Sequence, residues 1–370
     1  MHIGVNAHLL SGAAGYRSAG IHSYIEQLLR HLPTVTPPDW TLTAYVGAAN
    51  RMEFERIAIR RSGMDTSAPI RRILWEQFAQ PFQLDDIDLY HALAFVAPVL
   101  LRKPYVVTVY DLSFVHYPQV LSTARRLYLR LFTGLTCRRA RRVIAISQST
   151  ARDVAQTLRI PADKIDVAAP GYEPQMFRPL PAEAVADFRR KKGLPDRFWL
   201  FVGTLEPRKN LVTLLQAYAA LSPDQRLPLI IGGGKGWDYD AIFETAERYR
   251  LDVQFPGFIA SEELPFWYNC AEVFVYPSIF EGFGLPVLEA MACGTPVIVS
   301  DASSLPEVAG TSGMCVPPQD VEAWSEALRR AASDDDWRST AREQGFVEAA
   351  RYTWTETATR TVESYQHALK

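Results

Sequence analysis

Residues 275–301, VYPSIFEGFGLPVLEAMACGTPVIVSD, contain an apolar segment, a glycine-containing loop, a helix-like segment and a second apolar segment. Short runs this apolar are typical of strands that helices cover on both faces of a parallel sheet. Pro286 suits the first turn of a helix, because its φ is preset and its missing N–H would have no partner there. The stretch therefore predicts a strand, a helix beginning at Leu285 and a second strand.

The same alternation of strands and helices runs along the whole chain. A helix is expected at 22–32, and Gly171, Pro174, Pro179 and Pro181 mark a break between two halves. Expected strands are 2–9, 41–47, 88–93, 104–111, 142–149 and 165–171, then 198–205, 227–234, 252–259, 272–278, 295–301 and 313–318. Two such series predict an α/β protein with two doubly wound, Rossmann-like domains facing one cleft. In these sheets ligands bind beyond the carboxyl ends of the strands.

The composition is that of a soluble globular protein. The chain has 370 residues, of which 48 % are hydrophobic and 22 % charged, which excludes disorder, collagen-like repeats and a coiled coil. No uncharged apolar run reaches the roughly 18 residues of a membrane span, and the opening MHIGVNAHLL lacks a signal-peptide pattern. The four cysteines form no CxxC or zinc-site spacing. We therefore expect a reduced, cytoplasmic protein without a structural metal.

Charge is distributed unevenly along the chain. Residues 1–180 carry 21 Lys or Arg and 14 Asp or Glu, whereas residues 181–370 carry 18 and 27. Within residues 101–150 there are nine basic residues and one acid. A basic first half and an acidic second half indicate two domains with different partners.

The loop EGFGLPVLE, residues 281–289, follows an expected strand. Gly282 and Gly284 allow a close approach of the backbone, and free N–H groups at a helix start can bind an anion. Glu281 and Glu289, the latter expected in the first helical turn, offer carboxylates that accept hydrogen bonds from sugar and ribose hydroxyls. The alternative is an ordinary helix start in which Glu289 complements the helix dipole.

The segment GTLEPRKN, residues 203–210, follows another expected strand, with Gly203 and Thr204 at its end. Arg208 and Lys209 follow, and an adjacent guanidinium and ammonium suit a diphosphate. The alternative is surface charge at a helix start, although cations there oppose the helix dipole. The acidic triplets 238–240 and 334–336 do not follow strands as metal-binding carboxylates would, so we interpret them as solvated loop charges and expect no metal.

These motifs resemble the retaining glycosyltransferase family 4, the group 1 glycosyltransferases. The resemblance rests on residues 275–310, with Glu281 and Glu289 as the E-x7-E motif, and on FVGTLEPRKNL, VQFPGFI, GYRSAGIHSYIEQLLRHL and VIAISQSTARDV. It implies the GT-B fold, with an acceptor-binding domain at 1–173, a nucleotide-sugar-binding domain at 174–352, and a C-terminal helix at about 353–370 that packs back on the first domain.

The resemblance also implies roles for individual residues. Arg208 and Lys209 would bind the donor diphosphate, Glu281 the donor sugar, and Glu289 the ribose. The remaining donor-binding residues would be Gly203 and Thr204 at the strand end, Gly15 and Gly20 near the phosphates, Gly257, Phe258 and Ile259 against the base, and Gly282, Phe283, Gly284 and Leu285 through their backbone.

One position departs from the family pattern. Many members have His-Asp after a strand of the first domain, where this chain has Tyr110 and Asp111. A tyrosine, with its reference pKa of about 10, cannot replace a histidine as a base near neutral pH, although both residues remain candidates for the catalytic site. His8, His91 and His116 are the alternatives to the missing histidine, and a structural role is the competing interpretation of each.

The resemblance therefore implies a retaining, metal-independent hexosyltransferase without a cofactor. Among these enzymes the sequence most resembles bacterial mannosyltransferases of surface-polysaccharide assembly. This resemblance favours GDP-mannose as donor and a saccharide or lipid-linked saccharide as acceptor. It implies no nucleic-acid partner. A UDP-hexose is the alternative donor. A GT-B sugar-nucleotide epimerase and an inactive nucleotide-sugar-binding protein are the alternatives of other classes.

The arginine-rich stretch 125–142 has two interpretations. At helical spacing, Leu121, Ala124, Leu127, Tyr128, Leu131, Phe132 and Leu135 share one face. The first interpretation is a core helix with a solvated arginine face. The second is a peripheral contact with anionic membrane lipids, because clustered basic residues are attracted to such a surface.

Overall fold

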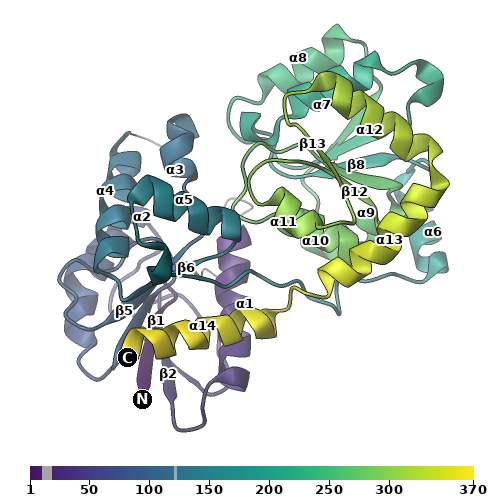
Figure 1. The fold of residues 1–370 in the computed structure, drawn as a ribbon. Coiled ribbons are helices and arrows are strands. Elements are labelled where there is room, and N and C mark those ends of the chain that lie inside the picture. The colour runs from purple at the N-terminus through teal and green to yellow at the C-terminus, as the bar shows by residue number, and fades with distance from the viewer. Residues whose placement is uncertain (11–18, 121–122) are drawn as a thin grey trace. The chain divides into compact units, whose positions relative to one another are not determined.

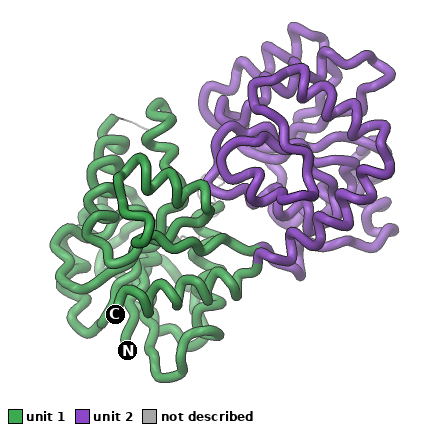
Figure 2. The backbone as a smooth tube through the Cα atoms, in the orientation of Figure 1, with its two compact units in different colours: residues 1–171, 353–370 green, residues 172–352 purple. Residues whose placement is uncertain are grey.

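The computed structural model describes residues 1–10, 19–120 and 123–370. The chain forms two compact units: Met1–Gly171 with Thr353–Lys370 make unit 1, and Tyr172–Tyr352 make unit 2 (Figure 2). The sequence placed the first boundary two residues later. Gly171 lies against the chain where it re-enters unit 1, and a Cβ there would be 2.3 Å from the Trp354 nitrogen. A glycine at position 171 therefore lets the two passages of the chain lie together.

Unit 1 is built on a seven-stranded sheet in the order β3-β2-β1-β4-β5-β6-β7, with every pairing parallel (Figure 1). Its strands are β1 His2–Asn6, β2 Thr41–Val46, β3 Ile57–Arg61, β4 Leu89–Ala92, β5 Tyr105–Val109, β6 Arg142–Ala145 and β7 Ile165–Val167. β3 was not predicted. It lies at the sheet edge and buries only Ile57 of its five residues, so it has no apolar run.

Helices cover this sheet. They are α1 Ala19–Val35, α2 Pro69–Leu74, α3 Ser113–His116, α4 Thr123–Arg139, α5 Gln148–Leu158 and α14 Trp354–Leu369, and α2 continues into a π-helical turn, η1 Trp75–Ala79, and a 3-10 turn, η2 Gln80–Gln83. The C-terminal helix α14 packs on α1, where the rings of Tyr24 and Trp354 meet at 5.6 Å. The strand expected at 142–149 ends at Ala145, because the Ser147 hydroxyl accepts the Thr150 N–H at 2.9 Å and caps α5.

The apolar face of α4 is not a core face. Leu127, Leu131 and Leu135 are 56 %, 58 % and 39 % exposed, so the expectation of a core stripe through them is wrong. The buried residues of α4 are Thr133, Gly134, Thr136 and Cys137. Leu121, predicted on the same face, lies outside the described residues.

Unit 2 repeats this architecture with a six-stranded parallel sheet in the order β10-β9-β8-β11-β12-β13. Its strands are β8 Trp199–Val202, β9 Leu229–Gly232, β10 Val253–Gly257, β11 Val273–Tyr276, β12 Val297–Ser300 and β13 Met314–Val316. Its helices are α6 Ala182–Lys192, α7 Leu211–Ala220, α8 Asp240–Arg248, α9 Leu264–Cys270, α10 Leu285–Ala292, α11 Leu305–Ala309, α12 Val321–Ser333 and α13 Asp335–Ala349. Each unit is thus a doubly wound α/β domain, which confirms the predicted fold class.

The strand order of each sheet contains a reversal that positions a site. In unit 2 the chain moves outward from β8 to β9 and β10, then returns to add β11 on the other side of β8. The loops after β8 and β11 therefore leave the same edge of the sheet in opposite directions. In doubly wound sheets, ligands bind in the crevice that such a reversal creates. No helix within the described part of the chain is long and apolar enough to cross a membrane.

Candidate active site

Two loops of unit 2 are joined where β8 and β11 end. The first passes from β8 into a 3-10 turn, η5 (Pro207–Lys209), and the second leads from β11 to α10. The Ile279 N–H donates to the Arg208 carbonyl at 3.0 Å, and the Ser278 hydroxyl donates to the same oxygen at 3.2 Å. Parallel pairing of β8 with β11 thus brings together two motifs that are about seventy residues apart in the sequence.

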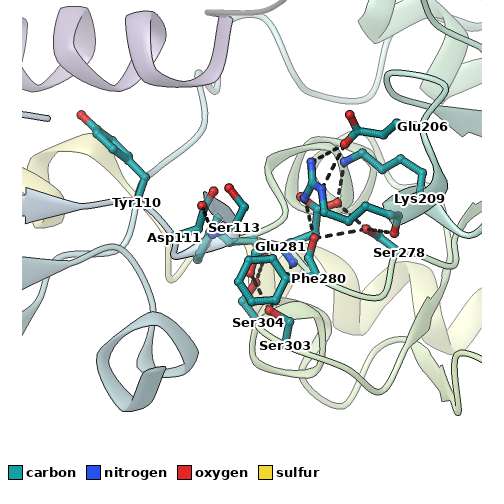
Figure 3. A network of polar contacts seen from close by, with 12 residues as sticks. Tyr110, Asp111, Ser113, Glu206, Lys209, Ser278, Phe280, Glu281, Ser303 and Ser304 are labelled. Atoms are coloured by element: carbon teal, nitrogen blue, oxygen red, sulfur yellow. Dashed lines mark hydrogen bonds and ion pairs between the residues drawn. The ribbon is translucent and has the colours of Figure 1, made fainter. Parts of the chain in front are cut away.

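Glu281 lies between two cations in this loop pair (Figure 3). Arg208 Nη1 is 3.0 Å from Glu281 Oε2, and Lys209 Nζ is 2.5 Å from Oε1. The Ser278 hydroxyl donates to Oε1 at 2.6 Å. Lys209 Nζ also donates to the Tyr276 hydroxyl at 2.7 Å. The side chains of Arg208, Lys209 and Glu281 are only 18 %, 8 % and 11 % exposed, so these charges interact with little screening by water.

Burial and ion pairing act in opposite directions on Glu281. Burial alone would raise the pKa of its carboxyl, but Arg208 and then Lys209 outweigh this and lower the pKa of Glu281 to about 2. Burial lowers the pKa of the Lys209 ammonium, and Glu281 opposes that shift. We conclude that Glu281 is ionised at neutral pH and that its charge depends on its two cationic neighbours.

A second carboxylate, Glu206, was missed by the sequence analysis. Arg208 donates to Glu206 Oε1 through Nε at 3.0 Å and through Nη2 at 2.6 Å. The cluster therefore holds two cations and two carboxylates. The available signal was the position of Glu206 two residues before Arg208 in the segment EPRKN.

Two serines that the sequence analysis also missed fix the backbone of Glu281. The hydroxyls of Ser303 and Ser304 donate to the Glu281 carbonyl at 2.6 and 3.0 Å, and Ser304 also donates to the Phe283 carbonyl at 2.5 Å. The Glu281 N–H donates to Ser303 Oγ at 3.2 Å. Both serines follow β12, the neighbour of β11, so a third strand end positions the same carboxylate.

The other side of the β8 loop contacts a glycine run, residues 232–236. The Gly203 N–H donates to the Gly232 carbonyl at 2.9 Å, and the Gly233 N–H donates to the Gly257 carbonyl at 2.7 Å. A Cβ at Gly233, whose φ is +151°, would lie 1.8 Å from the Gly203 oxygen. Gly203 and Gly257, two of the predicted donor-binding positions, therefore lie at the same edge of the sheet, and both contact Gly233. The sequence GGGKG gave this signal, but it was interpreted only as a strand end.

The start of α10 is as predicted from Pro286. Gly284 precedes the helix with a φ of +125°, Pro286 lies in its first turn, and Leu285 begins it. Gly282 and Phe283 are buried beside it. Glu289, however, is the fifth residue of α10 and not part of its first turn, so both the predicted position and the dipole alternative are wrong.

Glu289 has a different environment from Glu281. The Tyr268 hydroxyl donates to its Oε2 at 3.0 Å. Burial raises the pKa of Glu289 to about 8, the charge of Glu173 adds to this, and the Tyr268 hydrogen bond opposes it. The two carboxylates of the E-x7-E motif therefore differ in charge at neutral pH.

This difference predicts a pH-dependent stability. A carboxyl whose pKa is higher in the folded protein stabilises the fold below its unfolded pKa of about 4.5, and this contribution is lost as the pH rises through about 8. Glu289→Gln cannot ionise, so at pH 9 it should be more stable than the natural protein by about 1 kcal/mol, or about 2–4 °C in Tm. Thermal unfolding from pH 5 to 9 measures this, with the exposed Glu326→Gln as control. A difference in Tm that does not change with pH would contradict the assignment.

In unit 1, Tyr110 and Asp111 follow β5, as predicted, but Tyr110 is enclosed. It is 5 % exposed, packs edge-on against Tyr24 at 5.2 Å and Phe95 at 5.6 Å, and its hydroxyl has no hydrogen-bond partner among the described residues. This burial argues against the predicted catalytic role of Tyr110. Asp111 is partly exposed, and its Oδ1 accepts the Ser113 N–H at 2.7 Å.

The candidate histidines have structural partners. His91 bonds the hydroxyls of Tyr365 at 2.7 Å and Thr108 at 2.8 Å, and burial lowers its pKa to about 3. Burial and then Arg72 lower the pKa of His8 to about 4. His116 lies 2.9 Å from Asp153. His91 and His8 are therefore neutral structural residues in the fold.

The remaining predicted residues lie in varied environments. Phe258 is 64 % exposed, whereas Ile259 is 6 % exposed and packs on Gly232. Gly20 lies in the first turn of α1, Thr204 is partly exposed after β8, and Gly15 lies outside the described residues.

The acidic triplets differ from their predicted form. Asp334 to Asp336 do not lie in a loop, because Asp334 caps α13 by accepting the Trp337 N–H at 2.8 Å. Asp240 likewise begins α8. In the described ranges, no three His, Cys, Asp or Glu side chains lie together so that they could hold a metal ion.

Comparison with known proteins gives two family matches. Residues 19–175 match the model of Glycosyltransferase Family 4, and residues 185–348 match the model of Glycosyl transferases group 1. The O-antigen chain mannosyltransferase B of Escherichia coli is 33 % identical over 75 % of this chain and 74 % of its own length. The serotype-specific mannosyltransferase WbdA of Escherichia coli is 32 % identical over 63 % of this chain, which spans only 29 % of that protein.

Solved structures show the fold. The sucrose-phosphate synthase of Thermosynechococcus elongatus has a TM-score of 0.76 at 23 % identity, over 99 % of this chain and 98 % of its own. Anabaena HepE, solved with UDP and glucose, has a TM-score of 0.76 at 20 % identity, over 98 % and 99 %. Both family models and the relative that covers three quarters of each chain show that the chain belongs to the group 1 glycosyltransferases, and the solved structures show the GT-B fold.

Proposed function

We propose that the protein transfers a mannosyl group from GDP-mannose to a saccharide or lipid-linked saccharide acceptor in the assembly of a cell-surface polysaccharide. A relative that covers 75 % of the chain is an O-antigen chain mannosyltransferase, which supports both the sugar and the pathway class. The observation that carries the proposal is the buried cluster of Arg208, Lys209, Glu206 and Glu281 at the strand reversal of unit 2.

The cluster suits the chemistry of a leaving diphosphate. The bond that breaks joins the anomeric carbon to the donor phosphate oxygen, and negative charge develops on that oxygen. Arg208 and Lys209 supply preorganised positive charge where water is scarce, which is the most effective way to stabilise such a transition state. Glu281, ionised and fixed by Ser303 and Ser304, can accept hydrogen bonds from donor sugar hydroxyls and thereby orient the anomeric carbon.

We further propose that transfer proceeds with retention and without a metal. The acceptor hydroxyl forms the new bond to the anomeric carbon on the face that the diphosphate leaves. Its proton passes to the leaving phosphate oxygen. This step needs no protein base, which agrees with the neutral structural roles of His8 and His91. Arg208 and Lys209 then do the electrostatic work that a metal ion does elsewhere.

The other donor contacts follow from the family pattern and remain proposals. Glu289 would bind the ribose, Gly257, Phe258 and Ile259 would lie near the base, and Gly203, Thr204 and the 282–285 backbone would line the phosphates and sugar. Gly15 and Gly20 would approach the phosphates, and Asp111 would contact substrate from unit 1. The protein would act in the cytoplasm, with a peripheral membrane contact through the arginine-rich stretch 125–142 and no nucleic-acid partner.

A donor panel tests this function. GDP-mannose, UDP-glucose and ADP-glucose are each added to the protein, and Tm and sugar products are measured. A ligand at 100 times its Kd stabilises by about 2.7 kcal/mol, so GDP-mannose should give the largest shift and be slowly hydrolysed or transferred. A larger Tm shift with UDP-glucose would show that the donor is a UDP-hexose and not GDP-mannose. Formation of an epimer of the added sugar nucleotide would show that the reaction is epimerisation and not transfer. Binding without any turnover would leave a sugar-nucleotide-binding protein.

The same assay with excess chelator tests the metal. Activity should be largely unchanged by EDTA. Loss of turnover that manganese or magnesium restores would overturn the metal-independent step.

A further inference from the structure

The two cations of the unit 2 site share one partner, and each also has a partner of its own. The shared partner is Glu281 (Figure 3). The second partner of Arg208 is the carboxylate of Glu206, and the second partner of Lys209 is the hydroxyl of Tyr276. Glu281 has a part in the proposed transfer, as a ligand of the donor sugar, whereas Glu206 and Tyr276 have none. Their contacts therefore need a separate explanation.

Glu206 holds one side of the Arg208 guanidinium. Its Oε1 accepts Nε at 3.0 Å and Nη2 at 2.6 Å. On the other side, Nη1 donates to Glu281 Oε2 at 3.0 Å and to the Phe280 carbonyl at 2.5 Å. All three nitrogens of the planar guanidinium are thus engaged. If the contact with Glu281 were broken, the two bonds to Glu206 would still fix the plane of the group.

The backbone around Glu206 is itself fixed. The Leu205 N–H donates to the Gly234 carbonyl at 2.9 Å, and the Gly236 N–H donates to the Leu205 carbonyl at 2.9 Å. A Cβ at Gly236 would lie 3.3 Å from the Glu206 Cβ, so the glycine run packs directly against this residue. The Glu206 side chain is only 11 % exposed. Glu206 is therefore a rigid support for Arg208 and not a mobile surface carboxylate.

Tyr276 holds Lys209 in a comparable way. Lys209 Nζ donates to the Tyr276 hydroxyl at 2.7 Å and lies 5.0 Å from the centroid of the ring. The ring is 1 % exposed and stacks against Phe201 and Phe274, each with its centroid 5.6 Å away. A side chain that packing locks in this way can fix the position of another side chain.

The formal charges of the cluster show which contact a donor must break. Two cations face two carboxylates, and a diphosphate would add negative charge where water screens little. Like charges held side by side in such a site are costly. Glu281 is the carboxylate that contacts both cations, and the hydroxyls of the donor sugar offer it other hydrogen-bond donors. We therefore expect the diphosphate to replace Glu281 and not Glu206.

We propose that Glu206 and Tyr276 are positioning residues, which hold the two cations in place while the donor diphosphate replaces Glu281. Glu206 keeps the plane of the guanidinium, and Tyr276 keeps the position of the ammonium. The carboxylate of Glu281 turns to the sugar hydroxyls, while its backbone stays bound to the two serines after β12. The inference rests on the proposed binding of a diphosphate by these cations, but it applies to any nucleoside diphosphate sugar.

Calorimetric titration with GDP tests the replacement, because GDP has the diphosphate but no sugar. If the donor panel selects a UDP-hexose, UDP is titrated instead. Glu281→Gln lacks the carboxylate that competes for the two cations, so it should bind the nucleoside diphosphate about tenfold more tightly than the natural protein does. Titration in the cold, with circular dichroism, ensures that the variant is folded. Equal or weaker binding would show that the diphosphate and Glu281 do not compete, and would overturn the proposal.

Steady-state transfer tests the two positioning residues. Tyr276→Phe keeps the ring and removes the hydroxyl, so kcat should fall about tenfold, the scale of one lost hydrogen bond, while KM for the donor changes less than about threefold. Glu206→Ala should lose at least about tenfold in kcat for the same reason. Glu206→Gln keeps Oε1, which accepts both bonds from Arg208, and should therefore recover most of that loss.

The matched controls lie elsewhere in unit 2. Tyr218→Phe removes a hydroxyl that donates to the Leu227 carbonyl at 3.0 Å, from a residue that is 3 % exposed. Leu227 precedes β9, so this contact lies at the opposite edge of the sheet. Glu348→Gln changes a carboxylate of α13 that is 11 % exposed and pairs with Arg351 at 2.6 Å. Both controls should lower Tm but keep the natural kcat.

Two kinetic results would also overturn the proposal. A loss of Tm without a loss of kcat in Tyr276→Phe or Glu206→Ala would show a merely structural role. Equal losses of kcat in Glu206→Gln and Glu206→Ala would show that Glu206 acts through its charge and not by holding Arg208. The assays use whichever donor the natural protein turns over, so failure of GDP-mannose as donor is a separate result. Absence of turnover with every donor would contradict the proposed function, and the titration would still decide whether the diphosphate replaces Glu281.

Discussion

Glu281→Gln will lower the free energy of unfolding by about 3 kcal/mol, or about 6–12 °C in Tm, and will remove most of the transfer activity. The substitution keeps the volume of the side chain but leaves Arg208 and Lys209 in a poorly hydrated site, with Glu206 as the remaining carboxylate of the cluster. Removing one member of a buried ion pair costs more than the pair contributes, because the remaining charge stays desolvated. Thermal unfolding and a transfer assay measure the two effects.

The matched control is Glu326→Gln on α12. Glu326 pairs with Arg329 at 2.5 Å, but its side chain is 62 % exposed, and exposed pairs contribute about 0–1 kcal/mol. The control should therefore change Tm by no more than about 4 °C. Equal and small Tm losses in both variants would show that the Glu281 cluster is well hydrated, contrary to its burial in the structure.

The pKa of Glu281 defines the pH window of this stabilisation. Its pKa is about 2 in the fold, against an ordinary value of 4.5. A lowered carboxyl pKa contributes stability that is present above about pH 4.5 and is lost as the pH falls toward 2. The Tm difference between the natural protein and Glu281→Gln should therefore shrink below pH 4.5. Glu289 acts in the opposite direction and in a higher window, so the two variants separate the two carboxylates.

The fold was largely predictable because buried parallel strands are nearly continuous apolar runs. WLFV in β8, LIIG in β9 and VFVY in β11 are such runs, and each was expected. β3 was missed because it is an edge strand that buries only one of its five residues and ends with Arg60 and Arg61. It therefore shows neither an apolar run nor an alternation of apolar and polar residues. The outward face of α4 was also missed, because helical periodicity gives a stripe but not the direction in which the stripe points.

Three of the four residues of the cluster were singled out one by one from the sequence, but their contact with one another was not predicted. Arg208, Lys209 and Glu281 were each indicated by position after a strand, whereas their mutual contact depends on β8 pairing with β11, which strand spacing alone does not give. The sequence therefore predicted two cations for a diphosphate and did not predict that carboxylates already pair with them. Tyr110 is a different case, because its place in the family pattern suggested a part in catalysis, whereas its ring is buried against Tyr24 and Phe95.

Lys209→Met is expected to lower transfer by about a hundredfold or more, since loss of one preorganised charge-stabilising contact costs about 2.7–4 kcal/mol in the transition state. Methionine keeps the length of the side chain and its apolar contacts but removes the ammonium that donates hydrogen bonds to Glu281 and to the Tyr276 hydroxyl. Donor binding, measured as the Tm shift on adding GDP-mannose, should weaken less than the rate falls. Near-native turnover of the variant would show that Lys209 does not stabilise the leaving diphosphate.

The double variant Glu281→Gln/Lys209→Met distinguishes folding from catalysis. It removes one positive and one negative charge together, so the desolvated cation that destabilises Glu281→Gln is gone, and Tm should recover at least half of its loss. A non-additive recovery of this kind is the signature of a direct pair. Transfer should not recover, because the leaving diphosphate still lacks its ammonium and the donor sugar still lacks its carboxylate. If activity returned together with Tm, the two charges would serve only to hold the β8 and β11 loops together, and Arg208 would be left to stabilise the diphosphate.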